Sequence, residues 1–265
     1  MRFVTASSTS WQGRVVPATL QPADIAGMID HALLTPDLTS AEVRAGCALA
    51  ASRDVFSVCV KPADVILAAE VLAGTGVRVG TVIGFPHGSS ASSVKRYEAQ
   101  VALEDGAVEL DMVVNIAALR DRDDAYVVTD IGGVVAEARE SGALVKVILE
   151  NAYLDDEQIA RGSRLAEEAG AEFVKTSTGF AASGATVHDL LIMAAATSPR
   201  VQLKAAGGIR NVDRVLELVA IGVTRLGASA TASILDEAEA RVAEGGPLLV
   251  PAPPLNDGAD ATGGY

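Results

Sequence analysis

Three lysines interrupt segments of the chain that are otherwise rich in Val, Ile and Leu. They are Lys146 in the sequence VKVI, Lys175 in FVKT and Lys204 in QLKA. Lysine is rarely buried without a partner, so one such residue would be interpreted as an ion-paired structural side chain. Three on neighbouring predicted strands favour a chemical role instead. If all three face one enclosed space, each ammonium group disfavours protonation of the others.

A cluster of this kind suits covalent catalysis by a lysine amine. The pKa of a free lysine is about 10.4, and a decrease of about 3 units, or roughly 4 kcal/mol, makes the neutral amine plentiful at pH 7. A neutral lysine attacks carbonyl carbons and forms a Schiff base. The resulting iminium withdraws electrons from the adjacent carbon, so a carbon–carbon bond there can form or break. The lysines therefore predict a Schiff-base enzyme.

Acidic side chains occupy two of the predicted strands. Asp111, in ELDMV, is either the ion-pair partner of a strand lysine or a group that transfers protons with Lys204 as its neighbour. Asp30 is a weaker candidate, which either supports the site or orients the end of a strand. Glu109 shares a strand face with Asp111 if the strand is regular, and parity alone does not decide which of the two reaches the barrel mouth. Cys59 either faces that mouth or fills space in the core.

Eight short apolar segments would position these side chains. They span residues 28–34, 55–60, 77–85, 108–115, 144–150, 173–178, 201–205 and 225–227. Several are almost continuously apolar, which is typical of a parallel sheet covered on both faces. They recur at intervals of about 25–35 residues, and eight βα units of that size predict a single-domain α/β fold, the (β/α)8 TIM barrel. The alternative, an open doubly wound sheet, normally carries a Gly-rich fingerprint after its first strand, where this chain has HALL.

Helical periodicity fills the intervals between these segments. Apolar residues recur at helical spacing after Asn211 and after Thr186, so both residues are predicted N-caps. Ser92 or Ser93 is the predicted N-cap of an earlier helix. These helices would cover the outside of the barrel.

Glycines cluster after the last two predicted strands, and hydroxyl-bearing residues follow the sixth. In a (β/α)8 barrel the active site lies at the C-terminal ends of the strands, and the loops after strands seven and eight frequently bind phosphate. Backbone N–H groups and a helix N-terminus can hold an anion there without a large positive charge. The alternative is a set of ordinary βα turns. The candidate phosphate-binding and supporting residues are Thr178, Gly179, Gly207, Gly208, Gly227 and Ser229.

The composition restricts the functions open to the chain. Its 265 residues are 49% hydrophobic and carry a formal net charge of −13, and an acidic surface disfavours nucleic acids and anionic membranes as partners. No run of 18 apolar residues predicts a membrane span, and the start does not resemble a secretory signal. Two cysteines do not make a disulfide framework, so we expect free thiols and a cytoplasmic protein. Three histidines do not suggest a metal cluster, so we expect neither a metal nor another cofactor.

The two ends of the chain differ in composition from its middle. We predict a flexible extension over residues 1–20, the barrel over 21–244 and a flexible tail over 245–265. The last residue, Tyr265, is either an incidental aromatic or a phenol that the tail carries to the barrel mouth to assist proton transfer.

Seven motifs, in order over about residues 24–240, together resemble the deoxyribose-phosphate aldolase family. They are residues 29–31 (IDH), 57–60 (SVCV), 109–115 (ELDMVVN), 146–150 (KVILE), 173–180 (FVKTSTGF), 204–210 (KAAGGIR) and 226–229 (LGAS). The resemblance implies a class I aldolase that reversibly cleaves 2-deoxy-D-ribose 5-phosphate to D-glyceraldehyde 3-phosphate and acetaldehyde. It implies Lys175 as the Schiff-base lysine, with Asp111 and Lys204 as proton donors and acceptors. Phosphate contacts are implied for Gly179, Gly207, Gly208 and Ser229.

Two positions depart from the pattern of some family members. Ala230 stands where those members have a second serine, and Phe180 stands where they have a lysine, so the resemblance implies a lower phosphate affinity than theirs. One alternative function is a phosphosugar isomerase or synthase on the same barrel, which would not need three strand lysines. Another is a barrel that binds a ligand without catalysis. The expected partner is a phosphosugar, and a homodimer is a possible assembly.

Overall fold

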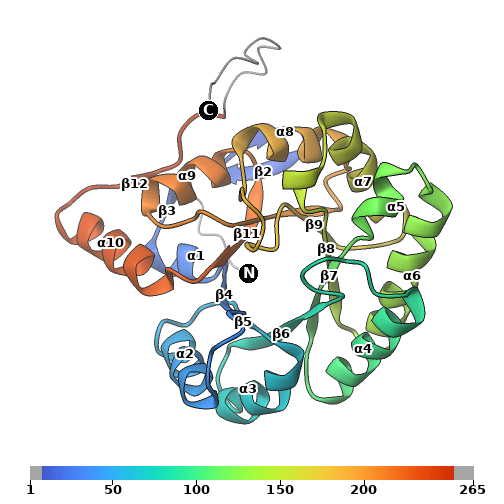
Figure 1. Cartoon of the computed structure of the whole chain (residues 1–265). Helices are drawn as coiled ribbons and strands as arrows, with labels where there is room; N and C mark the ends of the chain where they lie inside the picture. The colour runs from blue at the N-terminus through green and yellow to red at the C-terminus, as the bar shows by residue number, and fades with distance from the viewer. Residues whose placement is uncertain (1–7, 254–265) are drawn as a thin grey trace.

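A closed barrel of eight parallel strands forms the centre of the molecule (Figure 1). The computed structural model describes residues 8–253. The barrel strands are β4 (Ile29–Leu33), β5 (Ser57–Val60), β6 (Arg78–Ile83), β7 (Glu109–Val113), β8 (Leu144–Ile148), β9 (Phe173–Lys175), β10 (Gln202–Ala206) and β11 (Val223–Ala228). Each pairs with its neighbour in sequence, and β11 pairs with β4 to close the ring. The predicted (β/α)8 fold is confirmed.

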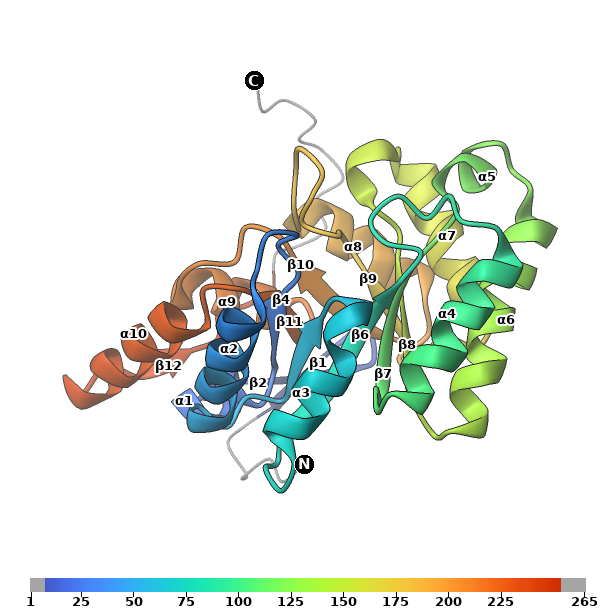
Figure 2. The same cartoon turned by 60° about the horizontal axis from the view of Figure 1, so that its bottom comes forward.

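Helices surround the barrel, and the loops that follow the strands gather at one end of it (Figures 1 and 2). The helices are α1 (Pro22–Ala26), α2 (Ser40–Ser52), α3 (Val65–Leu72), α4 (Ser92–Glu104), α5 (Ile116–Arg120), α6 (Asp124–Glu140), α7 (Asp156–Glu168), α8 (Val187–Ala196), α9 (Val212–Ala220) and α10 (Thr231–Ala243), with short 3-10 turns η1 (Pro62–Asp64) and η2 (Asn151–Tyr153). None of the helices within residues 8–253 is both long and apolar enough to cross a bilayer.

Alternation along the strands separates an apolar layer from a polar interior. Leu110 and Met112 of β7 belong to the buried hydrophobic cluster, as do Val145 and Val147 of β8. Residues between them in sequence point the other way, into the barrel. Barrel interiors are usually filled by branched apolar side chains. Here the inward positions of these two strands include charged residues, so the core that stabilises the fold lies mainly between the sheet and the helices.

Side-chain caps begin several of the helices, as the sequence predicts for two of them. The Asn211 side chain accepts a hydrogen bond from the N–H of Arg214 at the start of α9. Thr186 does the same for the N–H of Asp189 in α8. The prediction of Ser92 or Ser93 as an N-cap is wrong, because both lie within α4, whose N-cap is Ala91 without a side-chain cap.

The chain ends need a correction where the structure describes them. Residues 8–20 do not form a flexible extension: β1 (Ser8–Trp11) and β2 (Arg14–Pro17) form a hairpin, and β3 (Thr19–Leu20) pairs with β12 (Leu248–Leu249). Arg14 is buried and donates to the carbonyl of Val201 at 2.6 Å and to Thr197 Oγ1 at 2.9 Å. The hairpin therefore packs at the end of the barrel opposite the βα loops (Figure 2).

The predicted tail is also structured near its beginning. Leu248 is buried and Gly246 donates to the carbonyl of Arg241, so the chain continues to pack after α10. Residues 254–265, with Tyr265 among them, lie outside the described residues.

Candidate active site

The predicted lysines meet Asp111 inside the barrel. The Nζ of Lys175 lies 2.7 Å from Asp111 Oδ2, and the Nζ of Lys204 lies 2.6 Å from the same oxygen. Lys146 donates to the other oxygen, Oδ1, at 2.9 Å. All four side chains are buried. The structure thus brings together, from strands β7 to β10, the four residues with the strongest chemical signal in the sequence.

A second group of charges adjoins this one. Lys146 also lies 2.6 Å from Glu109 Oε2 and 3.1 Å from Asp30 Oδ2, an oxygen that Lys204 reaches at 2.5 Å. Arg225 Nη1 donates to Asp30 Oδ1 at 2.6 Å and to Glu109 Oε2 at 2.9 Å. Glu109 and Asp111 therefore both face the barrel interior. The described contacts of Lys175 are with Asp111, so Asp111 is the acid nearer the mouth.

These contacts set different protonation preferences for the buried groups. Burial alone would lower the pKa of Lys146, but Asp111, Asp30 and Glu109 together raise that pKa well above its ordinary value. Burial lowers the pKa of Lys204, and the neighbouring lysines act in the same direction against the two aspartates. Burial would raise the pKa of Asp111, but the lysines hold it well below its ordinary value. The three carboxylates therefore favour the protonated form of Lys146, while Lys204 gives up its proton more readily.

Cys59 lies among the same groups. Its side chain is buried on β5, and the charges that act on it are those of Asp111 and the three lysines. Burial, with a smaller contribution from Asp111, raises the pKa of the Cys59 thiol to about 11. The sulfur is therefore neutral at physiological pH, and Cys59 faces the site as a small uncharged side chain.

The loop after β9 is held by Glu150, to which sequence reasoning gave no role. The Glu150 carboxylate is buried and accepts hydrogen bonds from the Thr178 N–H at 3.2 Å and from the Thr178 hydroxyl. Thr178 Oγ1 in turn accepts from the N–H of Phe180 at 3.0 Å. Glu150 has φ 57° and ψ 65°, a left-handed conformation uncommon for a residue with a side chain. An acidic residue at the end of the predicted apolar segment 144–150 is the signal that was available in the sequence.

The candidate phosphate loops have backbone conformations that favour glycine. Gly179, Gly207 and Gly208 have φ values of 90°, 86° and 80°, which residues with a Cβ rarely adopt. A Cβ on Gly184 would lie 2.5 Å from the carbonyl carbon of Gly207, so the loops after β9 and β10 touch backbone to backbone. Gly179 and Gly208 are exposed at the barrel mouth, where a phosphate would need peptide N–H groups.

Gly227 and Ser229 lie at the end of β11. A Cβ on Gly227 would be 3.0 Å from the Cβ of Ala206 and 3.5 Å from the Cε of Lys204, so the absence of a side chain leaves room beside that lysine. Ser229 is exposed and precedes α10, whose N-cap, Ala230, makes no side-chain cap. The first N–H groups of α10 are therefore open to an anion.

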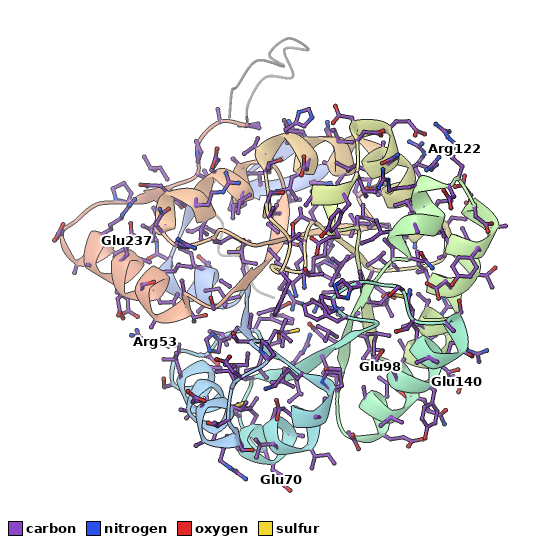
Figure 3. All side chains as sticks on the ribbon, viewed as in Figure 1. Arg53, Glu70, Glu98, Arg122, Glu140 and Glu237 are labelled. Carbon is purple, nitrogen blue, oxygen red and sulfur yellow. The ribbon has the colours of Figure 1, made fainter. Side chains whose placement is uncertain are left out.

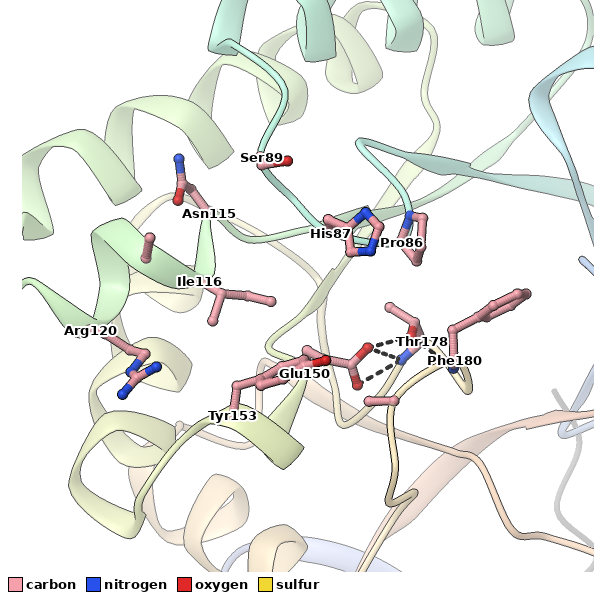
Figure 4. A pocket seen from close by; sticks show the side chains of 12 residues that line it. Pro86, His87, Ser89, Asn115, Ile116, Arg120, Glu150, Tyr153, Thr178 and Phe180 are labelled. Atoms are coloured by element: carbon pink, nitrogen blue, oxygen red, sulfur yellow. Dashed lines mark hydrogen bonds between the residues drawn. The ribbon is translucent and has the colours of Figure 1, made fainter.

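A cavity of about 310 Å³ adjoins the loop after β9 (Figure 4). Its wall comes from the segments that follow β6, β7, β8 and β9, and includes His87, Arg120, Tyr153 and Phe180. The ring of Phe180 packs edge-on against Phe85, with 5.3 Å between ring centroids. The three site lysines do not line this cavity, so it is a neighbour of the lysine cluster and not its enclosure.

Most other charged side chains lie on the outside of the helical ring. Of the residues labelled in Figure 3, Arg53, Glu70, Arg122 and Glu140 lie around its periphery. The charges inside the barrel are therefore a separate group. Within residues 8–253, no three His, Cys, Asp or Glu side chains are grouped so that they could hold a metal ion.

The sequence of this chain is similar to those of known aldolases. Residues 25–233 match the family model described as DeoC/LacD family aldolase. A protein named deoxyribose-phosphate aldolase from Rhodopirellula baltica is 44% identical over 83% of this chain and 92% of its own length. Deoxyribose-phosphate aldolase 1 from Bacillus licheniformis is 47% identical over 80% of this chain and 94% of its own.

A solved structure agrees with these matches. The crystal structure of a putative deoxyribose-phosphate aldolase from Coccidioides immitis aligns with a TM-score of 0.81 and 38% identity, over 83% of this chain and 88% of that one. The residues matched by the family model include every barrel strand and the lysine cluster. The chain therefore belongs to the DeoC/LacD family of aldolases.

Proposed function

We propose that this aldolase reversibly cleaves 2-deoxy-D-ribose 5-phosphate to D-glyceraldehyde 3-phosphate and acetaldehyde, with Lys175 as its nucleophile. The observation that carries the proposal is the oxygen that Lys175 shares with Lys204, Oδ2 of Asp111. One carboxylate oxygen serves two amines, and one of them can be neutral while the other remains an ion-paired ammonium. A neutral amine beside an acid and a protonated lysine is what carbinolamine formation and dehydration require.

The reaction follows from these groups. The lone pair of Lys175 Nζ attacks the C1 aldehyde carbon of the open-chain sugar, and loss of water from the carbinolamine gives the iminium. A base removes the proton of the C3 hydroxyl, the C2–C3 bond breaks, and its electron pair moves into the iminium to form an enamine. Glyceraldehyde 3-phosphate leaves. Protonation of the enamine at C2 and addition of water then release acetaldehyde and restore the amine.

Asp111 and Lys204 are the proposed proton donors and acceptors in these steps. Both lie in hydrogen-bond reach of one another, and Asp111 is also in reach of Lys175, so a proton moves among them without a change in backbone. Lys146 and Asp30 have a supporting role, because Lys146 holds Oδ1 of Asp111 and Asp30 holds the Nζ of Lys204. A phosphosugar isomerase or synthase would not need three buried lysines, so this group of amines favours the aldolase.

The phosphate is proposed to bind across the loops after β9, β10 and β11. Exposed peptide groups at Gly179 and Gly208, the hydroxyl of Ser229 and the open start of α10 lie at the same end of the barrel. Phe180 adds an aromatic ring there, where the family resemblance implies a lysine in some members. We therefore expect binding that depends more on backbone donors than on side-chain charge.

Three further features belong to the proposal. Tyr265 would assist proton transfer at the mouth, carried there by residues that lie outside the described part of the chain. The two cysteines, Cys47 and Cys59, are free thiols, which supports a cytoplasmic location. A homodimer is the proposed assembly, although a solved relative, the deoxyribose phosphate aldolase from Aeropyrum pernix, has a tetrameric structure.

Reductive trapping tests this function. Incubation of the full-length enzyme with acetaldehyde and borohydride should reduce the imine and leave an N-ethyl group on one lysine, which peptide mass mapping locates. We expect the group on Lys175 and on neither Lys146 nor Lys204, and no trapping in a Lys175→Ala variant. An adduct on another lysine would overturn the assignment. Full turnover of deoxyribose phosphate without any trapped lysine would overturn the Schiff-base mechanism.

A further inference from the structure

Arg225 places a guanidinium at the base of the charged cluster, away from the reacting amine. Its Nη1 donates to Asp30 and Glu109, and its Nη2 donates to Glu109 Oε1 at 3.2 Å. The guanidinium carbon lies 3.5 Å from the centre of the Phe56 ring, and only 4% of the residue is exposed. Arg225 is thus fixed by two carboxylates and an aromatic face, and its described hydrogen bonds are all with carboxylates.

The charges that face one another inside the barrel do not balance. Among the described residues, four cationic side chains share three carboxylates. The cations are Lys146, Lys175, Lys204 and Arg225, and the carboxylates are Asp30, Glu109 and Asp111. Cys59, the remaining titratable group that faces them, is neutral. Arg78 lies 3.7 Å from Glu109, but half of its side chain is exposed, so solvent screens most of its charge.

An excess charge in a buried cluster is relieved by the group that loses its proton most easily. An arginine does not lose its proton in proteins. Lys146 has three carboxylates within 3.1 Å and therefore keeps its proton. Lys175 and Lys204 remain, and they share one oxygen of Asp111. Without the guanidinium, three lysines would face three carboxylates, and all three amines could stay protonated.

We propose that Arg225 is a positioning residue whose permanent charge favours a neutral amine in the Lys175–Lys204 pair. The guanidinium does not touch the substrate. It forms ion pairs with Asp30 and Glu109. When every group is ionised, the cations inside the barrel then outnumber the carboxylates by one. The inference rests on the proposed function, in which that neutral amine is the nucleophile. A lysine in place of Arg225 would not serve equally, because it could lose its own proton and relieve the excess itself.

The pH dependence of imine formation tests this inference. The initial rate of trapping at limiting acetaldehyde, with excess cyanoborohydride, reports the fraction of neutral amine in the free enzyme. Arg225→Met should move the midpoint of the pH profile upward by about one unit. This is the effect expected when one positive charge is removed at a distance of two strands, from β11 to Lys175 on β9, in a partly screened interior. Glu109→Gln should move the midpoint downward, because it increases the positive excess. The double variant restores the original excess and should return the midpoint towards that of the unchanged enzyme.

Controls separate this effect from a loss of structure. Arg96→Met removes a cation from the outer face of α4, where Arg96 pairs with Glu137 and is more than half exposed, and it should leave the midpoint in place. Each profile is measured on protein whose circular dichroism matches that of the unchanged enzyme. If Arg225→Met does not fold, the pH midpoint of Glu109→Gln is compared with that of the double variant. The double variant should have the higher midpoint, because it lacks the guanidinium.

The outcomes distinguish the two proposals. Trapping that fails, or maps to another lysine, in the unchanged enzyme removes the proposed function. Trapping on Lys175 with midpoints that stay the same in the folded Arg225 and Glu109 variants removes only the role of Arg225. A lower melting temperature without any movement of the midpoint would show that Arg225 is a structural residue alone.

Discussion

Lys175 and Lys204 are register partners on adjacent parallel strands, and their ammonium groups converge on a single oxygen, Oδ2 of Asp111. The shared oxygen links the two amines chemically. When Lys175 becomes an imine nitrogen, Asp111 Oδ2 still holds Lys204, so the second amine remains in place as a proton donor. Substitutions around this oxygen should therefore separate the roles of the two amines.

Replacement of Lys204 should separate imine formation from turnover. In Lys204→Leu, acetaldehyde should still be trapped on Lys175, but the pH midpoint of trapping should rise because a neighbouring cation is gone. Turnover should fall by about 10²-fold or more, the usual contribution of a positioned acid or base. Lys61→Met, which changes a lysine that contacts the carbonyl of Leu38 outside the cluster, is the control. A pH profile identical to that of the unchanged enzyme would contradict the prediction.

Asp111→Asn should cost both stability and activity. The carboxylate contacts three buried ammonium groups, and the loss of one partner from a buried ion pair typically costs about 3–5 kcal/mol. Denaturant unfolding of the full chain would measure that loss. Exchange of solvent protons into bound acetaldehyde should also be slower in the fraction that remains folded, while phosphate binding should persist.

The exposed Asp121, which ends α5, offers the matched control for this variant. Asp121→Asn should alter neither stability nor proton exchange. If Asp111→Asn loses stability but exchanges protons at the normal rate, Asp111 serves as an ion-pair partner alone.

Glu150→Gln should affect the phosphorylated substrate more than acetaldehyde. The change weakens the hydrogen bonds that hold Thr178, and a bond to a charged group contributes roughly 1.5–3 kcal/mol. We expect KM for deoxyribose phosphate to rise about tenfold or more, with acetaldehyde trapping on Lys175 preserved. Glu140→Gln at the exposed end of α6 is the control. Equal losses with both ligands would show that Glu150 supports the whole site.

Acid should destabilise the fold through its buried aspartates. Burial would raise the pKa values of Asp30 and Asp111, but the neighbouring cations hold both below their ordinary value. A carboxyl group with a lower pKa in the folded state stabilises the fold above its unfolded pKa of about 3.9, and that stabilisation is lost as the pH falls through the folded value. Melting temperature should therefore hold near neutral pH and decline below about pH 4. A constant melting temperature down to pH 3 would count against this assignment.

Removal of Tyr265 alone tests the role proposed for the terminal phenol. If Tyr265 assists proton transfer, its deletion should slow the exchange of solvent protons into bound acetaldehyde and leave trapping on Lys175 unchanged. Mass spectrometry of acetaldehyde incubated in deuterated water measures that exchange. Equal exchange rates in the shortened and full-length enzymes would end the proposal.

The barrel and its lysines were predictable because buried parallel strands leave a strong pattern. A strand that is buried on both faces of the sheet is almost entirely apolar, so a lysine within it, such as Lys146, stands out. The regular spacing of these apolar segments indicates eight βα repeats. The partners of each charge were not predictable in the same way. Strand parity places Glu109 and Asp111 on one face, but the stagger between strands decides that Asp111 meets Lys175 and Glu109 meets Arg225.

The N-terminal hairpin shows the other limit of sequence reasoning. Its two strands have only four residues each, and β1 is mostly serine and threonine, so residues 8–17 do not resemble part of a fold. Arg14 is buried there because carbonyl and hydroxyl groups more than 180 residues away accept its hydrogen bonds. Contacts of that separation leave no local pattern. Glu150 was overlooked for a similar reason, since its partner Thr178 belongs to a different loop.

The contact between Asp30 and Arg225 joins the first barrel strand to the last, across 195 residues. During synthesis, Asp30 leaves the ribosome long before Arg225, which is one of the three cations that pair with it. A chain that ends before β11 would have to bury Asp30 and Glu109 without that partner, at a cost that favours an open, unfinished barrel. Closure of the barrel and assembly of its interior charges therefore depend on the same strand, and fragments that end before β11 should have no aldolase chemistry.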